Sequence, residues 1–112
     1  MLNDLKEYEA SGDNIVYITV AGLSDALSGV VAGYTRHPVI ACPPDSEKHG
    51  GAKVFSSTAM PKGIPVAYVE KPENAALAAV RILALTSPEL KKCLVDYNKK
   101  MAKAVYDGAE EV

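Results

Sequence analysis

The stretch IVYITV at residues 15–20, followed directly by AGLSDALSG at residues 21–29, decides the fold predicted for this chain. The first six residues are mostly β-branched and show no polar alternation, a pattern typical of a strand buried on both faces of a parallel sheet. The following segment leads into a helix, for which Ser24 or Asp25 can provide the N-cap and Gly33 lies near the end. The sequence therefore predicts a strand that runs straight into a helix.

Two more apolar segments predict strands, at residues 38–42 and 64–69. The earlier one is stopped by Pro43 and Pro44, which cannot donate ladder hydrogen bonds. The later one contains Pro65, which is tolerated near the start of a strand or at a sheet edge. A short helix is predicted around residues 54–57.

Three further helices complete the prediction. The first precedes residue 15, and its inward face consists of Leu2, Leu5 and Tyr8. The second begins at Pro72, and its apolar face is predicted from helical spacing: Ala76, Ala79, Val80 and Leu83. The third is long and begins at Ser87-Pro88, an N-cap followed by proline at the first helical position. Its apolar positions recur every three or four residues: Leu90, Leu94, Tyr97, Met101 and Ala104.

This order predicts a single α/β domain over residues 1–112, with a parallel sheet and right-handed crossovers. Three parallel strands leave two unprotected edges and a small interior. Either another chain completes the sheet, or part of the domain is missing from this sequence.

The composition argues against several classes of function. Lysine and arginine number 12 against 14 acidic residues, a formal net charge of −2, so no strongly basic surface is available for nucleic acid. The longest apolar run is far shorter than the ~20 residues that cross a bilayer, and no secretory signal is evident. Cys42 and Cys93 have no metal-ligand spacing around them. We therefore expect a cytoplasmic protein with reduced thiols and no metal.

The junction after residue 20 is the candidate binding site, because ligands of open α/β sheets bind where strands end and helices begin. Gly22 permits close approach of a ligand to the backbone, and free N–H groups at a helix start favour an anion. The competing interpretation is a plain strand-to-helix turn with a serine cap. Cys42 ends the next strand. A lone cysteine in such a place is more commonly a small buried hydrophobe than a nucleophile. Of the two histidines, His49 is the better proton-transfer candidate, while His37 indicates a solvated turn.

Four ordered motifs closely resemble the PurE family, and in particular the phosphoribosylaminoimidazole (AIR) carboxylases of its class II. The motifs are AGxSxALSG at residues 21–29, PVIxCPP at 38–44, SSxxMPxGIPV at 56–66 and NAALAA at 74–79. The resemblance implies a three-layer α/β/α, flavodoxin-like domain that forms a homo-octamer, with a last helix that reaches a neighbouring subunit. It also implies reversible carboxylation of aminoimidazole ribonucleotide, a carboxy-lyase or mutase reaction of purine biosynthesis, without a cofactor.

The same resemblance assigns the site. Its ligands would be an aminoimidazole ribonucleotide and CO2 or bicarbonate. The positions that would contact them are Ala21, Gly22, Ser24, Asp25, Ala26 and Leu27. No catalytic residue is assigned, and His49 remains a weak candidate.

The sequence also departs from the family pattern. The family's phosphate-binding Ser-Asp loop and its Ser-x-His loop, which carries the proton-shuttling histidine, are not found in these residues. Leu23 and Asp25 stand where class II members typically have arginine and asparagine. Two hypotheses follow: an AIR carboxylase whose N-terminal part is lacking or supplied by another polypeptide, and a non-catalytic PurE-like oligomeric module. The module would bind another small ligand or regulate a full-length paralogue.

Overall fold

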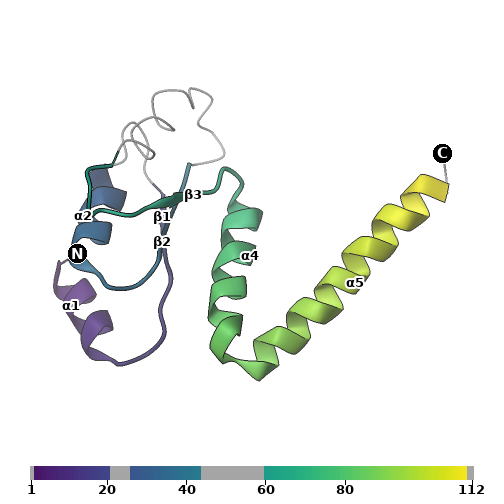
Figure 1. The fold of residues 1–112 in the computed structure, drawn as a ribbon, viewed down its shortest axis with the longest axis horizontal. Coiled ribbons are helices and arrows are strands. Elements are labelled where there is room, and N and C mark those ends of the chain that lie inside the picture. The colour runs from purple at the N-terminus through teal and green to yellow at the C-terminus, as the bar shows by residue number, and fades with distance from the viewer. Residues whose placement is uncertain (1, 21–25, 44–59, 111–112) are drawn as a thin grey trace. The chain divides into compact units, whose positions relative to one another are not determined.

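The computed structural model describes residues 2–20, 26–43 and 60–110, with two compact units at residues 1–79 and 80–112. The division between the units falls within one helix, α4. Figure 1 shows the elements, which follow the predicted alternation of strands and helices. They are α1 (Leu2–Ala10), β1 (Tyr17–Val20), α2 (Ala26–Tyr34), β2 (Val39–Cys42), β3 (Ala67–Tyr68), α4 (Pro72–Leu83), a 3-10 helix (Ala84–Thr86) and α5 (Pro88–Glu110).

The three described strands form one parallel sheet in the order β1-β2-β3. Tyr17 pairs with Val39 at one end of the β1–β2 ladder, and the Tyr17 N–H donates to the Pro38 carbonyl at 3.0 Å. The strand predicted at residues 64–69 is shortened to two residues, because Pro65 has no N–H for the ladder. One further bond extends this pairing, from the Val69 N–H to the Ala41 carbonyl at 2.9 Å.

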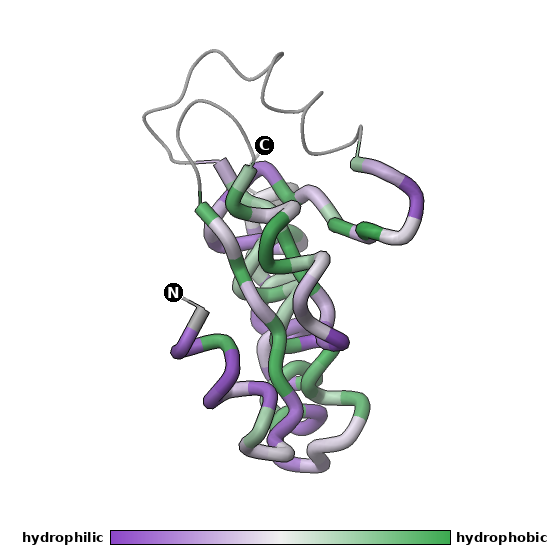
Figure 2. Tube along the Cα trace, turned by 90° about the vertical axis from the view of Figure 1, so that its left-hand side faces the viewer, coloured by the Kyte–Doolittle hydropathy of each residue, from purple (hydrophilic) through white to green (hydrophobic). Residues whose placement is uncertain are grey.

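The core of the first unit joins α1 and α2 to one face of the sheet. Its buried members are Leu5, Val31, Ala32 and Val39. Helix α1 is mostly hydrophilic (Figure 2), and Leu5, 4% exposed, is its buried apolar contact. The predicted inward position of Tyr8 is only half correct, since Tyr8 is 50% exposed and places its ring 6.4 Å from that of Tyr17.

Two glycines of α2 serve close packing. A Cβ at Gly29 would lie 3.4 Å from the Met60 sulfur, and one at Gly33 would lie 3.3 Å from the Ile64 Cδ1 atom. Because residues four apart share a helix face, both glycines admit neighbouring side chains on one side of α2. Gly33 lies near the end of α2 as predicted, but it acts through packing inside the helix and has no positive φ.

The strand predicted to be buried on both faces is β2 in the structure, not β1. All four residues of β2 are buried, whereas in β1 only Thr19 is buried. The prediction for residues 15–20 was wrong in this respect because β1 is an edge strand of the described sheet. Apolar composition alone does not distinguish an edge strand from a central one.

The helices of the C-terminal part begin where predicted. Pro72 opens α4, but its most buried residue is Ala75, at 0% exposure, while Ala76 is exposed. The Ser87 hydroxyl accepts a hydrogen bond from the Leu90 N–H at 3.3 Å, which confirms the predicted cap of α5. Along α5, Tyr97 and Met101 of the predicted apolar face are 44% and 49% exposed.

Several predictions fall outside the described residues. They concern the helix at residues 54–57 and the capping of α2 by Ser24 or Asp25. Within the described part of the chain, no helix combines the length and apolarity needed to span a bilayer.

Candidate functional site

The candidate site begins at the carboxyl end of β1 and continues into the first turn of α2. Of the predicted ligand-binding residues, Ala26 and Leu27 are described, and they open α2. Ala26 is exposed, whereas Leu27 is partly buried and packs against the core of Leu5, Val31, Ala32 and Val39. Ala26 is therefore accessible to a ligand, and Leu27 anchors the turn. The other predicted positions lie outside the described residues: Ala21, Gly22, Ser24, Asp25 and His49.

A buried hydroxyl pair fixes the two ends of this junction. Thr19 of β1 and Ser28 of α2 are 6% and 0% exposed, and their side-chain oxygens are hydrogen-bonded. The Thr19 hydroxyl also lies 3.5 Å from the Ile40 carbonyl. Buried hydroxyls are costly unless bonded, so this pair ties the end of β1 to the first turn of α2. Sequence analysis missed it, although the signal was present as single hydroxyls in an apolar strand and an apolar helix.

Cys42 ends β2 at the carboxyl ends of the strands, and its thiol is buried, 2% exposed, and not part of a disulfide. Its sulfur contacts two main-chain carbonyls, of Pro43 at 3.5 Å and of Glu70 at 3.8 Å. This placement agrees with the predicted role of a small buried hydrophobe. Cys93 is a free, exposed thiol on α5.

His37 does not occupy the solvated turn that the sequence indicated. Its side chain is only 11% exposed, and its Nε2 atom lies 3.3 Å from the Glu9 Oε2 atom of α1. The Glu9 carboxylate also accepts a 2.8 Å hydrogen bond from the Arg36 guanidinium. The prediction was wrong because the chain before β2 packs against the last turn of α1, which supplies the carboxylate.

Tyr17 joins this cluster from β1, with its ring 6.2 Å from the His37 ring. Burial and the neighbouring Glu9 carboxylate raise the pKa of the Tyr17 hydroxyl, while Thr35 and Arg36 oppose that rise. Glu9, Tyr17 and His37 gather at the amino end of the strands. They therefore lie at the opposite end of the strands from Ala26.

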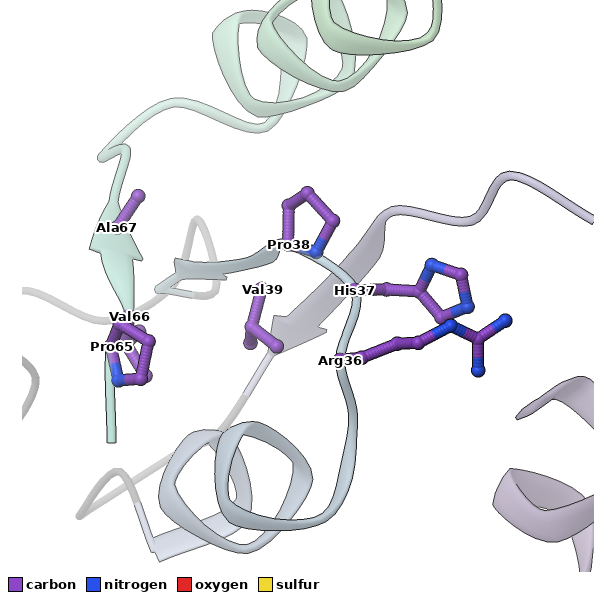
Figure 3. Close-up of a pocket in the computed structure, with 7 residues that line it drawn as sticks. All are labelled: Arg36, His37, Pro38, Val39, Pro65, Val66 and Ala67. Atoms are coloured by element: carbon purple, nitrogen blue, oxygen red, sulfur yellow. The ribbon is translucent and has the colours of Figure 1, made fainter. Parts of the chain in front are cut away.

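A groove of about 530 Å³ opens at this same amino edge (Figure 3). Its lining residues are Arg36, His37, Pro38, Val39, Pro65, Val66 and Ala67. Figure 3 shows the side chains of Arg36 and His37 extending to the same side, away from Pro65 and Val66. The groove is apolar over β2 and β3 and is separate from the candidate site.

Metal ligation finds no support in the part of the chain that is described. Among residues 2–20, 26–43 and 60–110, no three histidine, cysteine, aspartate or glutamate side chains lie close enough together to hold an ion.

A parallel sheet whose strand runs into a helix at the carboxyl edge defines this chain as a flavodoxin-like α/β domain, as predicted, with a long C-terminal helix. The chain belongs to the AIR carboxylase family, whose family model, "AIR carboxylase", matches residues 1–104.

Similar proteins agree with this membership. A phosphoribosylaminoimidazole carboxylase of Archaeoglobus fulgidus is 43% identical over the whole chain, and one of Treponema denticola is 45% identical over 92% of it. An N5-carboxyaminoimidazole ribonucleotide mutase of Methanocaldococcus jannaschii is 48% identical over 87% of the chain. The chain spans 61%, 65% and 63% of these three relatives, respectively.

A solved structure supports the same fold. The crystal structure of Treponema denticola PurE matches 99% of this chain with a TM-score of 0.91 and 41% sequence identity. The match covers 70% of that chain. This chain therefore matches about two thirds of the length of that solved chain.

Proposed function

We propose that this chain carries part of an AIR carboxylase site of purine biosynthesis, acting on an aminoimidazole ribonucleotide and CO2 or bicarbonate. The observation that supports this most is the family match over residues 1–104, which includes the strand-to-helix junction after β1. The relatives named as carboxylases and as a mutase are 43–48% identical to this chain over 87–100% of its length.

The proposed ligand contacts are the residues of that junction. They are Ala21, Gly22, Ser24, Asp25, Ala26 and Leu27. In support, Ala26 is exposed at the start of α2, where free backbone N–H groups favour a carboxylate or a polar ring edge. The Thr19–Ser28 hydrogen bond holds the strand and helix that flank the junction.

In the proposed reaction, a carbon of the imidazole ring forms a bond to the carbon of CO2, and the proton on that ring carbon passes to a base. Such a transfer requires a dry pocket and a proton-accepting group within hydrogen-bond reach. His49 is our candidate for that group. Among the described residues, His37 is unsuited to the role, because it lies at the amino edge of the sheet beside Glu9.

The direct test adds aminoimidazole ribonucleotide and bicarbonate to the purified chain and follows the carboxylated product by absorbance. Turnover that depends on both substrates and falls in a His49→Asn variant supports the proposal, with His37→Asn as the matched control. The absence of turnover would support the second hypothesis, a PurE-like module that binds without catalysis.

Binding can be tested separately from turnover by calorimetry. An Ala26→Phe substitution fills the start of α2 and should abolish binding of the ribonucleotide. Val30→Phe is the matched control, because Val30 is 48% exposed on the same helix, four residues further on. Equal affinity of the two variants would refute the proposed location of the site.

We further propose that the chain forms a homo-oligomer, with an octamer as the assembly that the family resemblance implies. The supporting feature is the apolar face of α5, where Tyr97 and Met101 are about half exposed and Val105 is 70% exposed. Burying such side chains is worth ~1.5–3 kcal/mol each. Light scattering should therefore show an oligomer that Met101→Glu weakens, whereas a monodisperse monomer would contradict the proposal.

A further inference from the structure

The groove at the amino end of the strands has an apolar wall that is open to solvent. Pro38, Pro65 and Ala67 are exposed, while Val66 is partly buried and Val39 is 4% exposed. Because proline has no N–H group, the backbone offers no donor at Pro38, before β2, or at Pro65, before β3. With a volume of about 530 Å³, the groove is within the size range of small-molecule sites. It can therefore accept an apolar body of that size.

Arg36 places a positive charge beside this apolar wall. Its Nη1 atom donates hydrogen bonds to the Glu9 carbonyl at 3.3 Å and to the Glu9 carboxylate at 2.8 Å. A guanidinium has five N–H donors in a planar fork, and the hydrogen bonds of Arg36 to the described residues use Nη1 alone. The Arg36 side chain is 60% exposed. The edge formed by Nε and Nη2 can therefore bind a carboxylate at two points.

The surroundings of Arg36 determine from which side an anion can approach. A second hollow, of about 210 Å³, is lined by Arg36, Glu9 and Tyr34, and the Glu9 carboxylate there would repel an anion. Among the described residues that line the groove, in contrast, none is acidic. In Figure 3, Pro38 and Val39 lie between strand β3 and the Arg36 side chain. A ligand lying on these two residues can therefore direct an anionic group toward Arg36.

We propose that the groove binds a small aromatic carboxylate, with its ring on Pro38, Val39 and Pro65 and its carboxylate on the Nε–Nη2 edge of Arg36. An aromatic ring suits this wall because proline rings pack well on aromatic rings, as in the aromatic-lined grooves that bind proline-rich segments. The groove lies at the opposite end of the strands from Ala26. This proposal therefore stands apart from the proposed reaction.

The test titrates the 112-residue chain with phenylacetate and with its uncharged counterpart, phenylacetamide, and follows the backbone amide signals by NMR. The two probes have the same ring and differ in the charged group. We expect saturable shifts at Val39, Val66 and Ala67, with no comparable shifts at Ala26 and Leu27. Phenylacetate should bind at least about tenfold more tightly than phenylacetamide, because hydrogen bonds between a guanidinium and a carboxylate are roughly twice as strong as neutral ones.

Four variants test the residues that carry the proposal. Arg36→Gln should weaken phenylacetate binding about tenfold or more and change phenylacetamide binding by less than about twofold. Lys71→Gln is the matched control, because Lys71 is exposed shortly after β3, at the carboxyl end of the strands. Since Arg36→Gln also loses the contact with Glu9, a second pair leaves that contact intact. Ala67→Glu and Ala67→Gln add side chains of the same size, and the glutamate should bind phenylacetate at least about fivefold more weakly, because its charge repels the carboxylate.

Four outcomes would overturn the proposal. Two of them are equal affinities for phenylacetate and phenylacetamide, and equal effects of Arg36→Gln and Lys71→Gln. Another is a set of shifts confined to Ala26 and Leu27, which would place the probe at the junction after β1. The last is the absence of saturable shifts at probe concentrations that leave the chain folded. The carboxylase assay bears on none of these outcomes, so failure of this proposal can be told from failure of the proposed function.

Discussion

Strands β1 and β2 are adjacent, paired in register and similar in composition, yet their surroundings differ. Every residue of β2 is buried, whereas in β1 Thr19 alone is buried and Val20 is the most exposed. Strand β2 is the central strand of the described sheet and β1 is at its edge. The comparison shows that position in the sheet, more than the residues of the strand itself, decides which apolar strands contribute to the core.

The largest effect should come from truncating the same residue type in both strands. Ile40→Ala removes a side chain that is 2% exposed and leaves a cavity, so it should lower the free energy of unfolding by ~2–5 kcal/mol. Ile18→Ala is the matched control, with a side chain that is 41% exposed, and should cost about 1 kcal/mol or less. Urea denaturation of both variants measures the difference. Equal losses would mean that β1 is as well covered as β2.

A smaller effect should come from the covered face of β1. Ser28→Ala deprives the Thr19 hydroxyl of its closest partner, which should cost ~1–3 kcal/mol. Thr19→Val should cost a similar amount, and the double variant should cost less than the sum, because neither hydroxyl is then left behind. The measurement is a double-mutant cycle by urea denaturation.

Ser11→Ala is the control for this cycle. It removes an exposed hydroxyl that bonds the Tyr8 carbonyl at 2.7 Å, so its effect should be within about 0.5 kcal/mol. Additive effects of Thr19→Val and Ser28→Ala would show that the two hydroxyls do not act as a pair.

The smallest effect should appear in alkaline titration. Burial, followed by the Glu9 carboxylate, raises the pKa of Tyr17 above its ordinary value of 10.0. The unfolded chain then loses this proton at lower pH than the folded chain. The stabilisation linked to Tyr17 is complete below pH 10.0 and is lost as the pH rises from there through the raised pKa.

Tyrosinate absorbance measures this titration, with Tyr17→Phe as the control. The variant should lack the part of the tyrosinate absorbance that develops at a pH above the ordinary tyrosine pKa of 10.0. A titration curve that Tyr17→Phe lowers uniformly, with no loss from its high-pH end, would contradict the packing of Tyr17 against α1 and His37.

Sequence patterns predicted the elements well where the signal was local. The Ser87-Pro88 start of α5 was correct because an N-cap and a proline at the first helical position act within a single turn. The parallel sheet followed from the alternation of strands and helices, and the family followed from the four ordered motifs. The length of the last strand was overestimated, although Pro65, which limits it, was visible in the sequence.

Features that depend on distant segments could not be predicted in the same way. His37 is buried because Glu9, on a helix 28 positions earlier in the chain, reaches it, and no local pattern indicates that contact. The exposure of Ile18 and Val20 depends on what lies beside β1, not on the residues of β1. At the candidate site, the sequence indicated the junction and its residues, while the Thr19–Ser28 bond that supports it required the structure.

The comparison of the two strands is tested most directly by amide hydrogen exchange of the 112-residue chain alone, read at Ile18 and Ile40. We expect that Ile40 exchanges at least about a hundredfold more slowly than Ile18, because the Ile40 amide lies inside the ladder and the Ile18 amide faces an open edge. Equal and strong protection of both amides would contradict it, since β1 would then have a neighbour on each side.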